Sequence, residues 1–268
     1  MSETTKRAFY EEVTIPDEAT GSRFTATLVN YDHGIYVRHL KLHQKEKPKR
    51  RTMPPLYSPV CIQYVLRSCY DIVTVDLDIC NPYYFLRSLI EVNLDKLKRI
   101  KITWPLIRIF SSPAVKRHFL LANQLHRKSI VSLDVPDIPD IVWTKFDILS
   151  KQDYLSQFIC LEHLTINQSM HVFISFTKIL SSLPRLKSLH YISSDSSLGV
   201  TDRDILDSSK AQYTNLETLS LDVYDLSAND VEYITSSLPN LKKADTSLER
   251  FKGYIGEFGY SIVLAGTL

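Results

Sequence analysis

One segment of this chain occurs twice. Residues 179–189 read ILSSLPRLKSL and residues 234–244 read ITSSLPNLKKA, so seven of eleven positions are identical at an offset of 55 residues. Each copy predicts the end of an amphipathic helix, a turn marked by proline, and a short strand whose apolar residues lie three and then two positions apart. Such a repeat constrains the fold strongly, because a repeated unit buries its apolar side mainly against its own neighbours.

The strand part of the unit, L-x-x-L-x-L, fits nine places along the chain. The nine fits begin at Tyr10, Val37, Ile72, Leu97, Ile130, Leu161, Leu186, Leu216 and Leu241. Their average spacing of about 29 residues lies at the long end of the range known for leucine-rich repeats. The sequence therefore predicts a single irregular leucine-rich repeat domain of about nine repeats over residues 1–268.

The residues between the leucines predict a polar face. At the second, third and fifth positions of the nine units, only Val73 and Val131 are apolar. This alternation is typical of a strand with one buried face and one solvated face. Repeated with a helix between, it predicts an α/β solenoid, or horseshoe, with a parallel sheet on the concave face and helices on the convex face.

Apolar stripes between the strands support the helices. The expected stripes are Val115, Phe119, Ala122 and Leu125; Phe173, Phe176, Leu180 and Leu183; and Val231, Ile234 and Leu238. Two segments have the form of a helix N-terminal capping box, Thr201–Asp204 and Ser227–Asp230.

Composition bears on whether the chain crosses or is exported through a membrane. It is 44% apolar and 23% charged, and it has no run of about 18 apolar residues, so we expect no membrane span. The N-terminus has no apolar stretch, so we expect no secretory signal.

The four cysteines, Cys61, Cys69, Cys80 and Cys160, have apolar neighbours and no paired motif. We expect reduced, buried thiols and a cytoplasmic or nuclear location, with metal or disulfide roles as the alternatives.

The charge is unevenly distributed. The net charge is +2, but residues 201–268 carry 11 acidic and 6 basic residues. The densest charge, Lys45–Arg51, lies in a predicted inserted basic loop at residues 43–58, where a solenoid accommodates insertions. Lys47–Arg51 is either a nuclear-localisation signal or a solvated loop. We do not expect nucleic-acid binding, because the run lacks interleaved aromatic residues and no nucleic-acid motif accompanies it.

Motifs of the common enzyme classes do not occur. The sequence has no G-x-x-x-x-G-K-[ST] phosphate loop, no H-E-x-x-H, no G-x-S-x-G and no C-x-x-C. Five of its seven glycines lie at or beyond Gly199, so no glycine-rich turn is placed to bring backbone amides to a phosphate. We therefore expect a non-enzymatic protein with no cofactor.

The polar strand face is the predicted binding surface for a protein partner. The second and fourth strands carry six basic or histidine residues, and Trp104 follows the fourth strand. Trp and Arg are enriched at interface hot spots, although Trp104 has the alternative of packing against the next helix. His163 and His190 fall on adjacent strands, where they are contact residues or, as an alternative, zinc ligands. The candidate partner-binding residues are Arg38, His39, Lys41, Lys98, Arg99, Lys101, Trp104, His163 and His190.

Several of these motifs resemble one known family. Residues 72–80, IVTVDLDIC, fit the cysteine form of the repeat, and LEHLTI, LKSLHY and LETLSL begin at Leu161, Leu186 and Leu216. The opening AFYEEVTI at residues 8–15 is similar to the first strand after an F-box in many fungal proteins, where a helix precedes it. The chain resembles the repeat portion of the F-box and leucine-rich repeat family.

This resemblance implies a function. In that family the repeats hold a substrate, and the F-box binds the adaptor of a cullin ubiquitin ligase. Only seven residues precede Ala8, so we expect adaptor binding only if an F-box lies upstream. The ninth position of most units departs from the family's Asn or Cys, as at Lys45, Pro105 and Ser169, which predicts irregular turns. The two hypotheses are a substrate receptor of a ubiquitin ligase and a scaffold with no ubiquitin role.

Overall fold

The computed structural model describes most of the chain in discrete segments. They are residues 2–43, 58–79, 82–103, 112–136, 151–168, 176–193, 198, 200, 213, 215–222 and 228–246. Residues 44–57 of the predicted basic loop, Cys80, Trp104 and the capping box at Thr201–Asp204 lie outside them. The chain divides into two compact units, residues 1–133 and residues 134–268.

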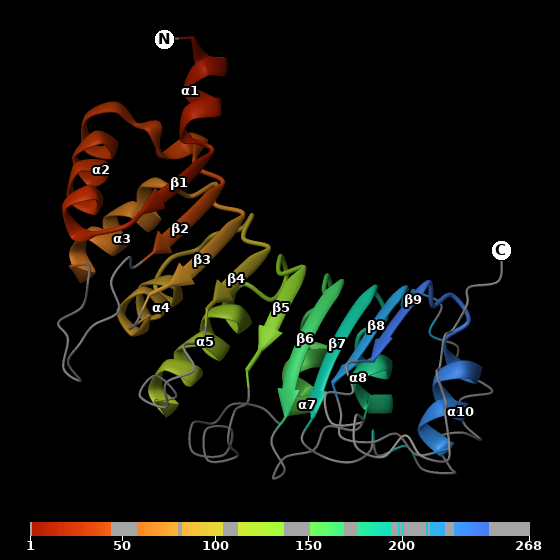
Figure 1. Cartoon of the computed structure of the whole chain (residues 1–268). Helices are drawn as coiled ribbons and strands as arrows, with labels where there is room; N and C mark the ends of the chain where they lie inside the picture. Colours follow the sequence, from red (N-terminus) through yellow and green to blue (C-terminus); the bar gives the residue numbers. More distant parts are fainter. Residues whose placement is uncertain are drawn as a thin grey trace, which may run out of the picture. The chain divides into compact units, whose positions relative to one another are not determined.

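The first unit alternates strands with helices. Its elements are α1 (Glu3–Tyr10), β1 (Glu12–Ile15), α2 (Glu18–Tyr31), the 3-10 helix η1 (His33–Tyr36), β2 (His39–His43), α3 (Pro59–Ser68), β3 (Thr74–Asp78), α4 (Tyr83–Ile90), β4 (Arg99–Ile102), α5 (Pro113–Leu125) and the start of β5 (Ser132–Val135). The strands pair in parallel in chain order from β1 to β5. Helices α3, α4 and α5 pack in succession along one side of the sheet (Figure 1).

The second unit has the same alternation. Its described elements are α7 (Lys151–Ser156), β6 (His163–Gln168), α8 (Phe176–Ser182), β7 (Ser188–Ser193), β8 (Thr218–Asp222), α10 (Ala228–Ser237) and β9 (Lys243–Thr246). Strands β6 to β9 also pair in parallel and in chain order. The α/β class with a parallel sheet is therefore confirmed.

The predicted strand positions are confirmed too. Each of the nine described strands begins two residues after the first residue of a predicted L-x-x-L-x-L unit, as Val37 precedes His39 and Leu241 precedes Lys243. The predicted alternation also holds, because β2 and β3 follow a strict pattern of half-buried and buried residues. The grouping of all these elements into one domain of about nine repeats stays a prediction.

The core of the first unit lies between the sheet and its helices. Leu40 and Leu77 on the strands are 1% and 0% exposed, and they face helices that bury Leu66, Phe85 and Phe119. Because a buried Leu or Phe side chain contributes roughly 1.5–3 kcal/mol relative to an exposed one, this face fixes the register of the strands.

One predicted helix position is wrong. Val115, Phe119 and Ala122 of α5 are buried, but Leu125 is 45% exposed. Helix α5 ends at Leu125, so the helical period no longer determines which side the chain presents there. The next residue, His126, is 3% exposed in its place. Its Nε2 donates to the carbonyl of Leu89 at 3.4 Å, and so caps the last turn of α4.

The core of the second unit is built around aromatic side chains. The ring of Phe176 packs edge-on against the rings of Tyr191 and Tyr233, with ring centroids 5.9 Å and 6.3 Å apart. Leu180, Leu183, Ile234 and Leu238 are buried as predicted, whereas Phe173 and the side chain of Val231 lie outside the description. Asp230 of the predicted capping box is fully buried, and its carboxylate accepts hydrogen bonds from the backbone amides of Leu198 and Val200.

Gly34 is required by close packing in the first unit. It lies in η1 against the last residue of α3, and a Cβ placed on it would lie 2.6 Å from the carbonyl carbon of Ser68. Ordinary contacts of a Cβ begin near 3.4 Å. A side chain at this position therefore requires η1 and α3 to separate.

Among the described residues the expected burial of the cysteines holds for Cys69 and is wrong for Cys61 and Cys160. Cys69 is fully buried, whereas Cys61 and Cys160 are only half-buried. Burial raises the pKa of the Cys69 thiol to about 12. Cys69 is therefore a core residue that stays protonated at neutral pH.

Candidate functional site

Parallel pairing arranges the polar face of the first unit in rows. The register of the strands produces a row of Glu12, His39, Thr74, Arg99 and Ser132, a second row of Thr14, Lys41, Asp76 and Lys101, and a shorter third row of His43 and Asp78. Side chains in one row lie on neighbouring strands about 4.8 Å apart. Their charges therefore act on one another directly.

The six predicted basic and histidine residues form two stripes. Arg38 comes just before β2, and His39 and Lys41 lie on it; Lys98 comes just before β4, and Arg99 and Lys101 lie on it. Strand β3 runs between the stripes and contributes Asp76 opposite both Lys41 and Lys101. The candidate list from the sequence held basic residues, histidines and Trp104, and it left out Asp76, which separates the two stripes.

Arg38 is held by a carboxylate beneath it. Its Nη1 lies 2.6 Å from Oδ2 of Asp71 and donates to the Asp71 carbonyl at 3.0 Å. Lys96 Nζ lies 2.6 Å from the other carboxylate oxygen. The hydrogen bond from Lys96, followed by that from Arg38, lowers the pKa of Asp71 against the opposing effect of burial. Arg38 is therefore committed to an internal contact.

The histidines of β2 also contact β3. His39 Nδ1 lies 2.8 Å from the hydroxyl oxygen of Thr74, and His43 Nδ1 donates to Oδ2 of Asp78 at 2.6 Å. Sequence reasoning missed His43 because it follows the six-residue unit by one position. Continuing the alternation beyond Leu42 would have placed it on the polar face. Among the described residues, no cluster of three or more His, Cys, Asp or Glu side chains is arranged to hold a metal ion.

The stripe on β4 is the more open of the two. Lys98 and Lys101 are exposed and Arg99 is half-buried. The backbone amide of Lys98 donates to the carbonyl of Val73 at 2.8 Å, and the amide of Val131 donates to the carbonyl of Lys98 at 2.9 Å. Lys98 therefore lies between two half-buried valines, which are the two apolar exceptions on the predicted polar face.

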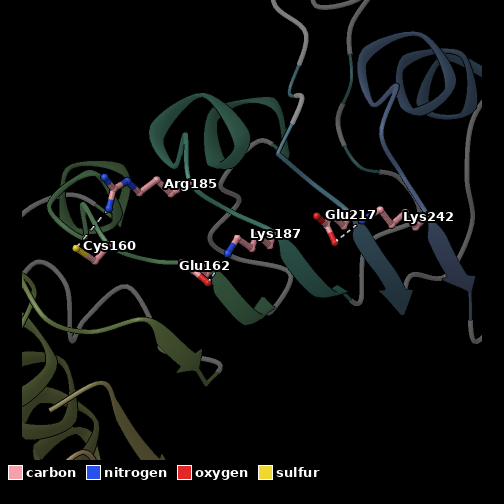
Figure 2. Close-up of polar contacts among 6 residues, drawn as sticks. All are labelled: Cys160, Glu162, Arg185, Lys187, Glu217 and Lys242. Atoms are coloured by element: carbon pink, nitrogen blue, oxygen red, sulfur yellow. Dashed lines mark hydrogen bonds and ion pairs between the residues drawn. The ribbon is translucent and has the colours of Figure 1, made fainter. Parts of the chain in front are cut away.

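In the second unit, the position just before each strand is charged. The residues just before β6, β7, β8 and β9 are Glu162, Lys187, Glu217 and Lys242, which alternate in charge. Lys187 Nζ lies 2.9 Å from Glu162, and Lys242 Nζ lies 3.1 Å from Glu217 (Figure 2). The hydrogen bond from Lys187 lowers the pKa of Glu162. We name these four residues the ion-pair ladder.

Cys160 lies beside this ladder. Arg185 Nη1 approaches its sulfur at 3.9 Å (Figure 2). Arg185 also contributes electrostatically to lowering the pKa of Glu162. Its positive charge therefore belongs to the same local network as the ladder.

His163 and His190 lie on adjacent strands but in different rows. His163 is opposite Ser188, whereas His190 is opposite Thr165. Both side chains lie on the polar face, His163 exposed and His190 half-buried. The predicted contact residue Trp104 lies outside the described residues.

No protein-family model matches the chain, and a search of curated proteins finds no significant match to it. Within the part of the chain that the structure describes, no helix is both long enough and apolar enough to cross a membrane.

Proposed function

We propose that this chain is a non-enzymatic protein-interaction module, built as a leucine-rich repeat solenoid whose polar sheet face binds a protein partner. One observation carries the proposal: each described strand begins two residues after the first residue of a predicted repeat unit, and half-buried and buried side chains alternate along β2 and β3. Stacked repeats of this kind present a broad polar surface on rigid strands, and repeat proteins use such surfaces for binding.

The context we propose is substrate recognition for an F-box-type cullin ubiquitin ligase. Support comes from the resemblance of the repeats at Leu161, Leu186 and Leu216 to those of that family. It also comes from the start of the chain, where α1 ends at Tyr10 and β1 begins at Glu12, in the helix-then-strand order of the resembling segment. Adaptor binding in this proposal requires an F-box upstream, and the module acts in the cytoplasm or nucleus.

The test places a bulky side chain on the polar sheet face of each unit and identifies the proteins that still bind. Ser132→Arg and Ser220→Arg place a bulky cation on the polar face of each unit, and Ser22→Arg places the same side chain on the exposed surface of α2 as a control. The tagged natural protein is cross-linked in its own cells, purified and analysed by mass spectrometry. We expect a partner that is lost with the two face variants and retained with Ser22→Arg.

The same experiment separates the two contexts. Recovery of an adaptor and a cullin together with the partner supports the ligase. Recovery of a partner without adaptor or cullin, from the full-length natural protein, removes the ligase and leaves a scaffold. Partners that are indifferent to both face variants would overturn the interaction role of this face.

A further inference from the structure

Strand β1 forms one edge of the sheet in the first unit. It pairs with β2 on one side, and no other described strand pairs with it. The carbonyl of Glu11 accepts hydrogen bonds from the amides of Arg38 and His39 at 2.9 Å, so the backbone groups of Glu11 and of alternate residues after it point toward β2. The N–H and C=O groups of Glu12 and Thr14 therefore point away from β2.

These outward groups have no other partner among the described residues. Glu12 and Thr14 are both exposed, and no hydrogen bond from another described element reaches the backbone of either residue. Helix α1 packs against η1 and leads into the start of β1, so the helix lies beyond the strand rather than along it (Figure 1). A strand edge of this kind is a template on which another extended chain pairs.

The buried side of β1 is also incompletely covered. Val13 lies in register with Leu40, Val75 and Ile100 on the next three strands. Those three side chains are 1%, 0% and 0% exposed, whereas Val13 is only half-buried. The row of core residues therefore ends at an apolar side chain that one further strand would cover.

Glu12 is the charged side chain on the polar side of β1. It has a strand neighbour on one side only, His39, whose Nδ1 lies against the hydroxyl of Thr74. Lys41 lies opposite Thr14, two residues further along β1. Within the described residues Glu12 forms no ion pair. A cation on the open side of Glu12 would therefore form a favourable cross-strand pair.

We propose that the outer edge of β1 binds an extended segment of a partner protein, which adds to the sheet as one further strand. The segment's backbone pairs with Glu12 and Thr14, an apolar side chain covers Val13, and a Lys or Arg lies beside Glu12. Because side chains alternate along a strand, the basic and the apolar residue are adjacent in the partner's sequence.

Strand addition to an open sheet edge is a recurring mode of peptide recognition. Backbone hydrogen bonds supply affinity, and the alternate side chains supply specificity. The inference adds a contact at the edge of the sheet and does not depend on the polar sheet face proposed above.

A second copy of this chain fits the edge less well than a basic partner. Two β1 edges paired with each other would place residues 11–15, EEVTI, against the same sequence. This segment has two carboxylates and no cation. Glu12 would therefore meet no opposite charge in a second copy, and carboxylates brought together across a strand pair are destabilising.

The experiment compares two substitutions at one backbone position. Thr14→Pro removes the outward N–H but no hydrogen bond to β2, and proline is tolerated on edge strands for this reason. Thr14→Val keeps the N–H and is the matched control. Random 12-residue peptides displayed on phage are selected on the whole chain, and we expect enriched peptides in which a Lys or Arg is adjacent to an apolar residue. A synthetic copy of the strongest peptide should bind at least tenfold more weakly to Thr14→Pro and within twofold to Thr14→Val.

Two further measurements do not depend on the folding of the proline variant. Glu12→Lys leaves the backbone unchanged and should weaken the same peptide at least threefold, because it places two cations beside each other. Amide hydrogen exchange followed by NMR should show fast exchange at Thr14 and slow exchange at Val13 in the free chain. The bound peptide should slow the exchange of Thr14. Circular dichroism and urea unfolding show whether each variant keeps the fold.

The possible results separate this inference from the proposed function. Peptides that bind the natural chain, Thr14→Pro and Glu12→Lys equally well, or that leave Thr14 unprotected, would overturn strand addition at this edge. A dimer seen by analytical ultracentrifugation and abolished by Thr14→Pro would replace the partner segment with a second copy. Enrichment of no peptide would refute the edge site, whereas cross-linked partners lost with Ser132→Arg or Ser220→Arg would still support the polar sheet face.

Discussion

Replacing Gly34 with alanine tests the packing of η1 against α3. The added Cβ would lie 2.6 Å from the carbonyl carbon of Ser68 and 3.3 Å from the amide nitrogen of Cys69. These atoms and the still closer carbonyl oxygen of Ser68 belong to the backbone, so no side-chain rotation relieves the overlap, and α3 has to move by about 1 Å or more to restore ordinary contact near 3.4 Å. Cys69, at the end of α3, is fully buried, so this movement also disturbs the core.

Overpacked substitutions in protein cores cost typically 1–3 kcal/mol, and we expect Gly34→Ala near the upper end, at about 2–3 kcal/mol, because the obstruction is backbone. Urea unfolding followed by circular dichroism measures this as a lower transition midpoint with an unchanged slope. Ser22→Ala, on the exposed surface of α2, is the matched control and should leave the midpoint unchanged. If Gly34→Ala unfolds at the midpoint of the natural chain, the reasoning about this contact is wrong.

Two further predictions concern buried titratable groups. Burial lowers the pKa of His126 despite the opposing effects of the Leu89 carbonyl and the charge of Asp95. As the pH falls, His126 is therefore protonated in the unfolded chain before it is protonated in the folded chain. The contribution of His126 to the free energy of unfolding is fully present above about pH 6.5. It is lost as the pH falls through the folded pKa, with a slope approaching about 1.4 kcal/mol per pH unit. His126→Gln keeps a hydrogen-bond donor for the Leu89 carbonyl and should reduce the change in urea midpoint between pH 7 and pH 5. An equal change of midpoint with pH in both proteins would contradict this. A thiol reagent at pH 8 should modify Cys61 and Cys160 in the folded chain but reach Cys69 only after unfolding, because its pKa is about 12 and it is fully buried. Rapid native modification of Cys69, located by peptide mass spectrometry, would refute its burial.

The buried side of the fold could be predicted from the sequence because it repeats. Leu40, Val75 and Leu189 occupy equivalent strand positions, and each has to be apolar to pack against the helices. The one wrong helix position, Leu125, lies where the period ends. At the end of a helix the backbone leaves the helical path, so the helical period no longer decides which side chain is buried. Here the hydrogen bond of His126 to the Leu89 carbonyl decides it.

The polar face could be placed from the sequence, but its contacts could not. The partner of Arg38 is Asp71, which lies in a turn and belongs to no repeat position. Charges on a solvated face need not follow the repeat period, because water stabilises each of them equally well. The ion-pair ladder is the exception, since its alternating signs at one position of four successive units were a signal available in the sequence.

The ion-pair ladder affects the charge of the surface more than the stability of the fold. Glu217 and Lys242 are 46% and 71% exposed, and exposed pairs of this kind contribute little to folding because water already solvates both charges. Their effect is on the electric field of the surface. Neighbouring lysines and glutamates at 2.9 and 3.1 Å cancel at short range, so the second unit presents an almost neutral row. In the first unit Lys98 occupies this position between Val73 and Val131, so its neighbours in the row are apolar side chains. Reversing the charge of Lys187 and Lys242 should therefore change the field of the second unit's surface while leaving its urea midpoint almost unchanged.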